Sequence, residues 1–221
     1  MFILEDYLEN LINECRCAYG ERLVYLGLQG SYLRGEATEN SDIDIMTVID
    51  GLTAADMDFY REILKKIGYY ERSCGFICGK DDLVRWNPLE ALQLRYTTKD
   101  LYGSLADLLP EAKREDEINY VKLSLGDLYH ELCHRYIHSD KENSAVKLPF
   151  TLKRFFFLIQ NLHYLECGEF LLTKRELKEN VSPADRYILE LPDNYSPQDF
   201  DAVFPKVIEW CRQAFVRADE Q

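Results

Sequence analysis

The chain has 221 residues, of which 47% are apolar and 13% aromatic, and a formal net charge of −13 at pH 7. Its length allows one large domain or two small ones, and its composition excludes a disordered or low-complexity chain. The negative charge argues against long nucleic acid as the main partner, because binding a phosphate backbone favours a basic surface. It argues less against a small nucleotide, since a metal cation can bridge phosphate groups and carboxylates.

The N-terminal segment has apolar residues at helical spacing and no basic leader. Residues 3–18 therefore predict an amphipathic helix instead of a signal peptide. No apolar run approaches the roughly 20 residues that a membrane span needs, so no membrane association is expected. The seven cysteines are an odd number scattered along the chain. They predict reduced thiols in a cytoplasmic protein.

The sequence up to residue 110 alternates strand and helix signals, with a β-branched run at 43–49 and a plausible N-cap at Thr53. We expect strands at 22–28, 43–49 and 69–79, a Gly30–Ser31 turn, a short helix at 31–38, a helix at 53–67 and a further helix that begins at Asn87–Pro88. This pattern predicts an α/β (α+β) domain at 1–110.

The composition changes near Pro110, where a charged stretch looks like a domain boundary. Beyond it the apolar residues recur at a spacing of three to four, which is typical of helices. We expect helices at 120–138, at 150–168 with Gly168 as its stop, at 173–179, and at 200–218 with an interruption near Pro205. This pattern predicts an all-α helical bundle at 111–221.

Two aspartates, Asp42 and Asp44, lie two residues apart at the start of an apolar strand. A strand places residues i and i+2 on the same face, so the two carboxylates would repel each other unless a cation neutralises them. The preceding strand leads into Gly30 and Ser31, where the backbone can approach an anion closely and a helix N-terminus and a hydroxyl can donate hydrogen bonds. Carboxylates and a triphosphate are oxygen ligands that Mg²⁺ prefers, so this arrangement predicts a magnesium–nucleotide site.

The stretch GSYLRGEATENSDIDI, residues 30–45, resembles the signature of the DNA polymerase β-like nucleotidyltransferase superfamily. It is most similar to the small bacterial branch that contains the aminoglycoside and minimal nucleotidyltransferases. The resemblance implies a nucleotidyltransferase domain with a mixed sheet, followed by a helical bundle that closes the cleft and helps to bind the acceptor. The residues that it assigns to nucleotide phosphate are Gly30, Ser31, Arg34 and Ser41, and those that it assigns to metal binding and catalysis are Asp42 and Asp44.

Active members of that superfamily usually carry a third acidic residue on a later strand, as a metal ligand or as the base that takes the acceptor proton. Glu71 lies near the start of the expected strand 69–79, but an acid flanked by apolar residues is missing there. Asp82 is expected to cap a short helix instead. Glu131 and His130, in the helical part, remain candidates for the base or for a contact with the acceptor.

Histidines at a spacing of four mark the helical part: His130, His134 and His138 would form one stripe on a helix. Residues 130–134 also satisfy HExxH, the pattern of zinc proteases, although a zinc hydrolase would leave the Gly-Ser and Asp-x-Asp motifs unexplained. A polar stripe that faces the cleft or makes hydrogen bonds is the plainer interpretation. The helical part also resembles the HEPN bundles that accompany minimal nucleotidyltransferases, but the Arg–His spacing of their ribonuclease members is absent.

The favoured interpretation is a cytoplasmic, Mg²⁺-dependent nucleotidyltransferase. It would move a nucleoside monophosphate, AMP from ATP or its equivalent from another NTP, onto a hydroxyl of a small molecule or a protein, with the acceptor between the two domains. The negative charge would suit a cationic acceptor, such as an aminoglycoside-like antibiotic. The missing third acid leaves a non-catalytic, antitoxin-like nucleotide-binding module as the alternative, and the sequence leaves a homodimer open.

Overall fold

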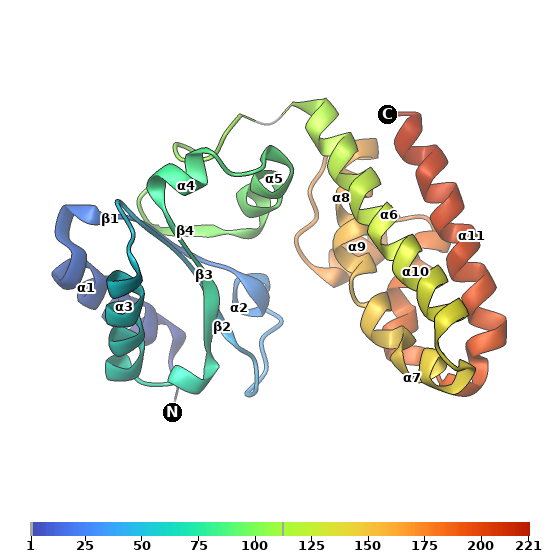
Figure 1. Cartoon of the computed structure of the whole chain (residues 1–221), viewed down its shortest axis with the longest axis horizontal. Helices are drawn as coiled ribbons and strands as arrows, with labels where there is room; N and C mark the ends of the chain where they lie inside the picture. Colours follow the sequence, from blue (N-terminus) through green and yellow to red (C-terminus); the bar gives the residue numbers. More distant parts are fainter. Residues whose placement is uncertain (1, 112) are drawn as a thin grey trace. The chain divides into compact units, whose positions relative to one another are not determined.

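The computed structural model describes residues 2–111 and 113–221, which divide into two compact units, one up to residue 112 and the other Lys113–Gln221 (Figure 1). The first unit contains a sheet with helices on its faces. Its elements are α1 (Leu4–Tyr19), η1 (Gly20–Arg22), β1 (Leu23–Leu28), α2 (Gly30–Arg34), β2 (Ile43–Ile49), α3 (Ala54–Ile67), η2 (Tyr70–Arg72), β3 (Ser73–Gly79), α4 (Lys80–Val84), α5 (Pro88–Thr97) and β4 (Lys99–Tyr102).

The sheet is mixed and has the strand order β3-β2-β1-β4. Strand β1 pairs antiparallel with β2 and with β4, whereas β2 and β3 are parallel. The mixed sheet expected from the resemblance is therefore confirmed. The sequence did not predict β4, because Lys99–Tyr102 has four residues and no clear alternation of apolar and polar side chains.

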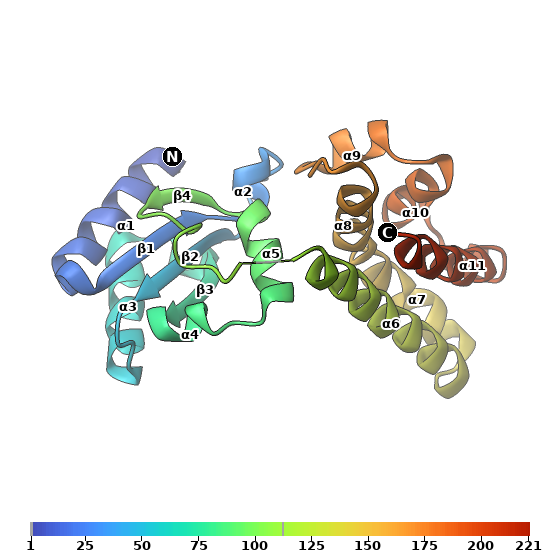
Figure 2. The ribbon, with the colours of Figure 1, turned by 90° about the horizontal axis from the view of Figure 1, so that it is seen from above.

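Successive side chains of β2 point to opposite faces of the sheet. Ile43, Ile45 and Ile49 pack with α1 and α3, which cover one face (Figure 2). Met46 and Val48 pack on the other face with residues of α4 and α5. Because the side-chain period of a strand is two, Asp44 belongs to the second face, in the row of Met46 and Val48.

Two local expectations in this unit were wrong, and a third was confirmed. The strand expected at 69–79 begins at Ser73, because Tyr69 has a left-handed backbone with φ 59° and the next three residues form the 3₁₀ turn η2. The helix expected at 31–38 ends at Arg34, where the left-handed Gly35 stops it with φ 67°. The expectation that Asp82 caps a short helix is confirmed: from the third position of α4 its carboxylate accepts a hydrogen bond of 3.2 Å from the backbone N–H of Gly79, the N-cap residue.

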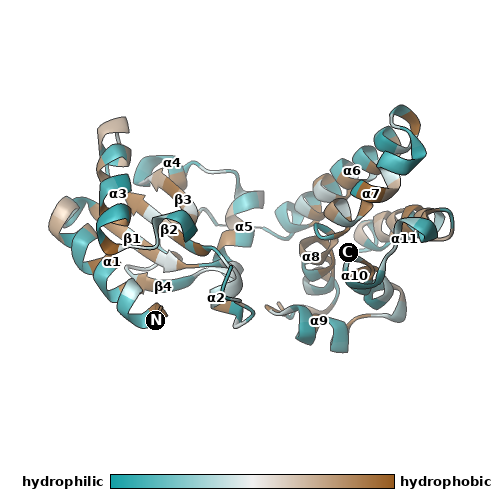
Figure 3. Ribbon diagram, turned by 90° about the horizontal axis from the view of Figure 1, so that it is seen from below, coloured by the Kyte–Doolittle hydropathy of each residue, from teal (hydrophilic) through white to brown (hydrophobic). Residues whose placement is uncertain are grey.

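In the second unit, the described residues form helices joined by loops and no strands, as the sequence predicts. Its helices carry both hydrophobic and hydrophilic stretches (Figure 3), and the hydrophobic side chains meet in one core. Its elements are α6 (Arg114–His138), α7 (Lys141–Leu152), α8 (Phe155–Cys167), α9 (Lys174–Asn180), α10 (Pro183–Asn194), η3 (Pro197–Asp199) and α11 (Phe200–Asp219).

Helix α10 was not predicted, α6 begins at Arg114 and not at residue 120, and two further expectations in this unit also differ from the structure. The pattern at 150–168 is divided between α7 and α8, with a break at residues 153–154, although it does stop at the left-handed Gly168. Helix α11 runs through Pro205 without interruption. Pro205 lacks the N–H that would bond to the carbonyl of Asp201, but Asp201 lies in the exposed first turn, where water can satisfy that carbonyl.

None of the helices in the described residues combines the length and the hydropathy that a bilayer span requires.

Candidate nucleotide site

The two aspartates of the Asp-x-Asp motif lie where β2 begins. Asp42 is exposed and Asp44 is partly buried. In the described chain neither carboxylate forms an ion pair with lysine or arginine. Burial raises the pKa of Asp44, and the charge of Asp42 raises it further, while a hydrogen bond from the Cys74 thiol and the charge of Arg34 act in the opposite direction. The predicted carboxylate repulsion is thus present, and a bound cation would relieve it.

The Gly-Ser turn packs directly against Asp44. The backbone N–H of Gln29 donates a hydrogen bond of 2.9 Å to the carbonyl oxygen of Asp44. Gly30 has φ 66°, and a Cβ atom added to it would lie 1.9 Å from Oδ2 of Asp44. Glycine is therefore required at position 30 both by its backbone and by the carboxylate that lies over it.

Ser31 follows in the first turn of α2. In the described chain its hydroxyl has no hydrogen-bond partner, so it is available to a ligand. Helix α2 has five residues. At that length the backbone N–H groups of its first turn, rather than a developed helix dipole, would face a phosphate.

The other two residues assigned to the nucleotide have partners within the protein. Arg34 forms an ion pair of 2.8 Å with Glu36. The hydroxyl of Ser41 accepts a hydrogen bond of 2.8 Å from the backbone N–H of Thr38, which closes the polar turn before Asp42. Ser41 thus shapes the chain that leads into the motif, and Arg34 lies near enough to Asp44 to lower its pKa.

Sequence analysis missed Arg72, which holds this turn in place. Its Nε and Nη2 donate hydrogen bonds of 3.1 and 3.0 Å to the carbonyl oxygen of Ser41, and Nη2 also contacts the hydroxyl of Tyr32 in α2. One guanidinium thus connects the segment before Asp42 with the helix that carries Ser31. The contact joins residues 31 positions apart, so no local sequence pattern could reveal it.

The position beside Asp44 on β3 holds a cysteine. The parallel register pairs Asp44 with Cys74, so both side chains lie on the same face of the sheet. Cys74 is exposed, and its pKa is raised by burial and by the neighbouring carboxylates Asp44 and Asp42. Glu71, the acid expected near this strand, lies in the exposed turn η2. The strand neighbour of the motif is therefore a thiol and not a third carboxylate.

These residues fit a magnesium ion that is bound together with a nucleotide. Among residues 2–111 and 113–221, no three His, Cys, Asp or Glu side chains are arranged to hold a metal ion by themselves. Mg²⁺ commonly binds through one or two carboxylates, with substrate phosphates and water completing its shell. Asp42 and Asp44 supply such a pair, and the lack of a side chain at Gly30 lets the Asp44 carboxylate lie against the Gly-Ser turn.

Glu131 and His130, the candidates from the helical part, lie on α6. The carboxylate of Glu131 accepts hydrogen bonds from Arg135, Thr151 and Arg154, at 2.5, 2.7 and 2.5 Å. Both of its oxygens are thus engaged within the second unit. This arrangement argues against the zinc-hydrolase alternative, in which the glutamate of HExxH must activate water. His130 is exposed.

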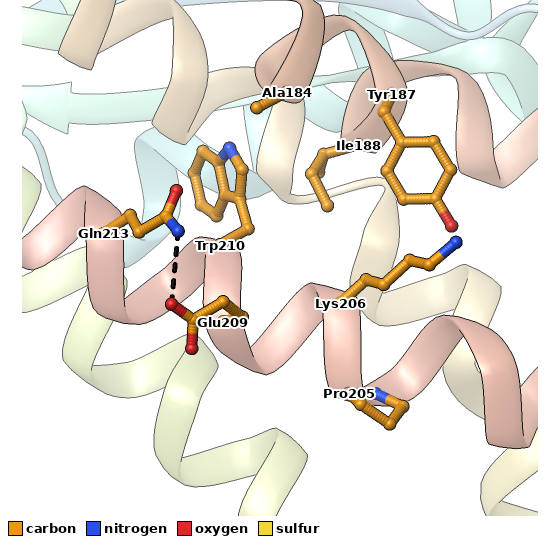
Figure 4. A pocket seen from close by; sticks show the side chains of 8 residues that line it. All are labelled: Ala184, Tyr187, Ile188, Pro205, Lys206, Glu209, Trp210 and Gln213. Atoms are coloured by element: carbon orange, nitrogen blue, oxygen red, sulfur yellow. Dashed lines mark hydrogen bonds between the residues drawn. The ribbon is translucent and has the colours of Figure 1, made fainter.

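The second unit also contains a hollow of about 450 Å³ between α10 and α11 (Figure 4). Trp210, Ile188 and Pro205 give it an apolar lining, and Lys206 and Glu209 bring opposite charges to it. It contains no paired carboxylates and no glycine turn. The chemistry expected of a magnesium–nucleotide site is found at Asp42 and Asp44.

Comparison with known proteins identifies the family of the chain. Residues 8–118, just over half of the chain, match the family described as "Nucleotidyltransferase domain". A protein from Methanocaldococcus jannaschii to which a protein adenylyltransferase activity is ascribed is 30% identical over 59 residues. That match covers 27% of this chain and 40% of the relative, so the chain spans well under two thirds of the relative's length.

Of two solved structures that align with the chain, one shares its fold. The spectinomycin adenyltransferase from Enterococcus faecialis, solved with ATP and spectinomycin, aligns with a TM-score of 0.54 at 17% identity, over 97% of this chain and 99% of that chain. A chain of a toxin–antitoxin complex solved with AMP-PNP aligns at 23% identity over 59% of this chain and 93% of that chain, with a TM-score of 0.33, which is too low to indicate a shared fold. The chain belongs to the nucleotidyltransferase domain family.

Proposed function

We propose that this protein transfers AMP from ATP to a hydroxyl group of a small molecule or of a protein. The observation that carries the proposal is the pair Asp42 and Asp44: Asp44 lies against Gly30, and neither carboxylate has a lysine or arginine partner in the described chain. Family membership supports nucleotide transfer. Each acceptor class is suggested by one similar protein. The spectinomycin adenyltransferase was solved with a small-molecule acceptor, and the Methanocaldococcus jannaschii protein is ascribed adenylyltransferase activity on protein.

The protein's own residues would divide the work as follows. Gly30 and Ser31 would bind nucleotide phosphate through backbone N–H groups and a hydroxyl. Asp42 and Asp44 would hold Mg²⁺, which when bound neutralises their repulsion and polarises the phosphate that is transferred. Arg34 would reach a phosphate by exchanging its ion pair with Glu36 for one with the nucleotide.

A cationic acceptor, such as an aminoglycoside, remains part of the proposal because the chain carries a net charge of −13. The seven cysteines are all free, which favours a reducing compartment and hence the cytoplasm. A homodimer is compatible with this function, since the residues proposed for the nucleotide all lie in one unit of one chain.

The alternative function is a nucleotide-binding module without fast turnover. The observation that favours it is Cys74, because a thiol occupies the strand position beside Asp44. Removal of the acceptor proton would then depend on Glu71 or on a group of the acceptor itself. The two functions share the nucleotide site and differ in whether pyrophosphate is released.

Thermal unfolding with and without Mg·ATP tests the nucleotide site, because a ligand that binds the folded state raises the melting temperature. We expect Mg·ATP to stabilise the wild type and not the double variant Asp42→Asn/Asp44→Asn. Asp58→Asn removes an exposed carboxylate of α3 and serves as the matched control, which should respond like the wild type. A double variant that responds fully to Mg·ATP would contradict the proposal.

Pyrophosphate release then separates the enzyme from the binding module. The wild type is incubated with Mg·ATP and a panel of aminoglycosides, other hydroxyl compounds and candidate proteins. Release that depends on one acceptor and disappears in the double variant supports transfer. Stabilisation by Mg·ATP without release for any acceptor supports the binding module.

A further inference from the structure

Three of the four histidines of the chain lie in one nine-residue stretch of α6. His130, His134 and His138 are all exposed and follow each other at one-turn intervals. Their ring centroids are 5.9 Å apart for His130 and His134, and 4.7 Å apart for His134 and His138. The imidazoles thus form a continuous row, which we call the histidine row, on the surface of the second unit.

The imidazoles of the histidine row keep their nitrogen lone pairs available. Neighbouring rings contact each other, and within the described residues none of the three donates or accepts a hydrogen bond. His130 and His134 also line a hollow of about 360 Å³ together with Asp127, Glu131 and Ser139. Solvent-sized ligands therefore have access to the row.

Charge does not select the sign of a ligand in this hollow, because acidic and basic side chains balance there. Arg154 pairs with both Asp127 and Glu131, and Arg135, which also lines the hollow, pairs with Glu131. Neither an anion nor a cation would therefore meet an uncompensated charge. The groups available to a ligand are the imidazole nitrogens of the histidine row, which favour a transition-metal ion.

We propose that the histidine row binds one divalent transition-metal ion of the zinc, nickel or copper class. His134 would be one ligand and either His130 or His138 the other. Imidazole suits these metals, whereas Mg²⁺ and Ca²⁺ prefer oxygen, so this site is distinct in chemistry from the proposed nucleotide site. Because no three metal-binding side chains converge in the described chain, water would complete the coordination.

The ring separations agree with chelation by neighbouring pairs. A metal–nitrogen bond of about 2.1 Å places the ring centre roughly 3.2 Å from the ion, so two rings on one ion lie at most roughly 6.4 Å apart. Both measured separations, 5.9 and 4.7 Å, are below this limit. The shorter one corresponds to a nitrogen–metal–nitrogen angle of roughly 90 degrees, which suits octahedral coordination. Rotation of exposed side chains then suffices to bring either pair onto an ion.

Because His134 belongs to both pairs, the proposal predicts a specific pattern of metal binding among the alanine variants. Since each pair needs His134, a chain binds one ion and not two. His134→Ala removes both pairs, whereas His130→Ala and His138→Ala each leave one pair intact. All three residues are exposed on a helix, so alanine should not disturb the fold.

The test is calorimetric titration of the full untagged chain with Ni²⁺, in a reducing buffer that contains excess Mg²⁺ to occupy Asp42 and Asp44. We expect one Ni²⁺ per wild-type chain, and a loss of affinity of roughly tenfold or more in His134→Ala. His130→Ala and His138→Ala should each still bind one ion. His163→Gln removes the one histidine outside the row and serves as the matched control, which should bind like the wild type.

Thiols need a separate control, because Cys17, Cys74 and Cys167 are exposed. The absorption spectrum of the Co²⁺ complex distinguishes nitrogen from sulfur ligands, and we expect no thiolate charge-transfer band. Wild-type affinity in His134→Ala, equal losses in His134→Ala and His163→Gln, or a thiolate band in the tight complex would each overturn the proposal.

Discussion

Buried carboxylates of the two units have opposite surroundings. In the helical unit, Asp185 is 1% exposed and accepts hydrogen bonds from Trp210 Nε1 and from both terminal nitrogens of Arg217, at 2.8, 2.8 and 3.0 Å. In the sheet unit, Asp44 is partly buried beside a second aspartate, and no lysine or arginine of the described chain pairs with either of them. One unit neutralises its buried carboxylate within the chain, and the other leaves its carboxylate pair without a lysine or arginine partner in the described residues.

We infer that this difference separates charge that stabilises the fold from charge that serves the proposed nucleotide site. A buried carboxylate is costly unless it is paired and hydrogen-bonded, and the network around Asp185 meets that requirement inside the chain. The pair Asp42 and Asp44 meets it when a cation binds. Substitutions should therefore affect stability most in the first network and ligand binding most in the second.

The largest effect on stability is expected for Asp185→Ala. The substitution leaves Arg217 without one of its two carboxylate partners and leaves Trp210 Nε1 without an acceptor. Loss of one member of a buried ion pair typically costs about 3–5 kcal/mol in the free energy of unfolding. Urea unfolding followed by far-UV circular dichroism measures it, and the response of the folded variant to Mg·ATP should be unchanged.

Asp58→Ala is the control for Asp185→Ala. Its carboxylate pairs with Arg61 on the surface of α3, and its side chain is 72% exposed. Such pairs are worth less than about 1 kcal/mol. Equal losses in the two variants would mean that burial of the Asp185 network adds no stability beyond that of an exposed ion pair.

The next largest effect, a loss of stabilisation by Mg·ATP, is expected for Gly30→Ala, with Gly35→Ala as its control. Both glycines have left-handed backbones, with φ 66° and 67°, so alanine introduces a similar strain of about 1 kcal/mol at each. They differ in their neighbours: a Cβ at Gly30 would lie 1.9 Å from Oδ2 of Asp44, and a Cβ at Gly35 would meet no atom within 4 Å. Gly30→Ala should therefore displace Asp44 and abolish stabilisation by Mg·ATP, whereas Gly35→Ala should keep it.

The glycine pair thus isolates one contact from backbone strain. Thermal unfolding of both variants, with and without Mg·ATP, provides the measurement. If both variants keep the nucleotide response, the packing of Gly30 against Asp44 has no role in binding. If both lose it, the strain in α2 and not the carboxylate contact is responsible.

The sequence revealed those parts of the molecule that depend on local patterns. Strand 43–49 has the expected bounds, and Thr53 caps α3 through the capping box with Asp56, because β-branched runs and N-cap residues act over a few positions. The mixed sheet could be expected because the Gly-Ser and Asp-x-Asp motifs identified the superfamily. Strand β4 could not, because Lys99–Tyr102 becomes a strand through its pairing with β1 and not through its own composition.

The same limit applies to the site. Spacing in the sequence placed Asp42 and Asp44 on one face and Gly30 near a phosphate. The contacts of Arg72 with Ser41, and the pairing of Cys74 with Asp44, depend on segments about 30 residues apart that meet in the sheet. A pattern of neighbouring residues carries no information about such contacts, which is why the third acid was sought at Glu71 while Cys74 lies beside the motif.

A smaller effect is expected for Arg72→Lys, which tests whether the turn before Asp42 must be held in place. Lysine keeps the charge, but it cannot reproduce the planar guanidinium that contacts the Ser41 carbonyl and the Tyr32 hydroxyl together. We expect the dissociation constant of Mg·ATP to rise about tenfold, as for other residues that position metal ligands. Arg61→Lys on α3 is the control. An unchanged dissociation constant in Arg72→Lys would assign Arg72 to stability alone.

The smallest effect concerns Asp56, a carboxylate of the sheet unit that is neutralised within the chain. Hydrogen bonds from Arg22, and next from Thr53, hold the pKa of Asp56 well below its ordinary value of 3.8. A lowered folded-state pKa stabilises the protein above the unfolded-state pKa, and this contribution is lost as the pH falls through the folded-state pKa. The melting temperature of Asp56→Asn should therefore lie below that of the wild type at pH 7, and the gap should narrow as the pH falls below about 4. Melting curves between pH 2 and 7 measure the gap. A constant difference in melting temperature would mean that Asp56 stabilises the fold through hydrogen-bond geometry and not through its charge. Neutralisation of this carboxylate within the chain would then make no measurable contribution to stability.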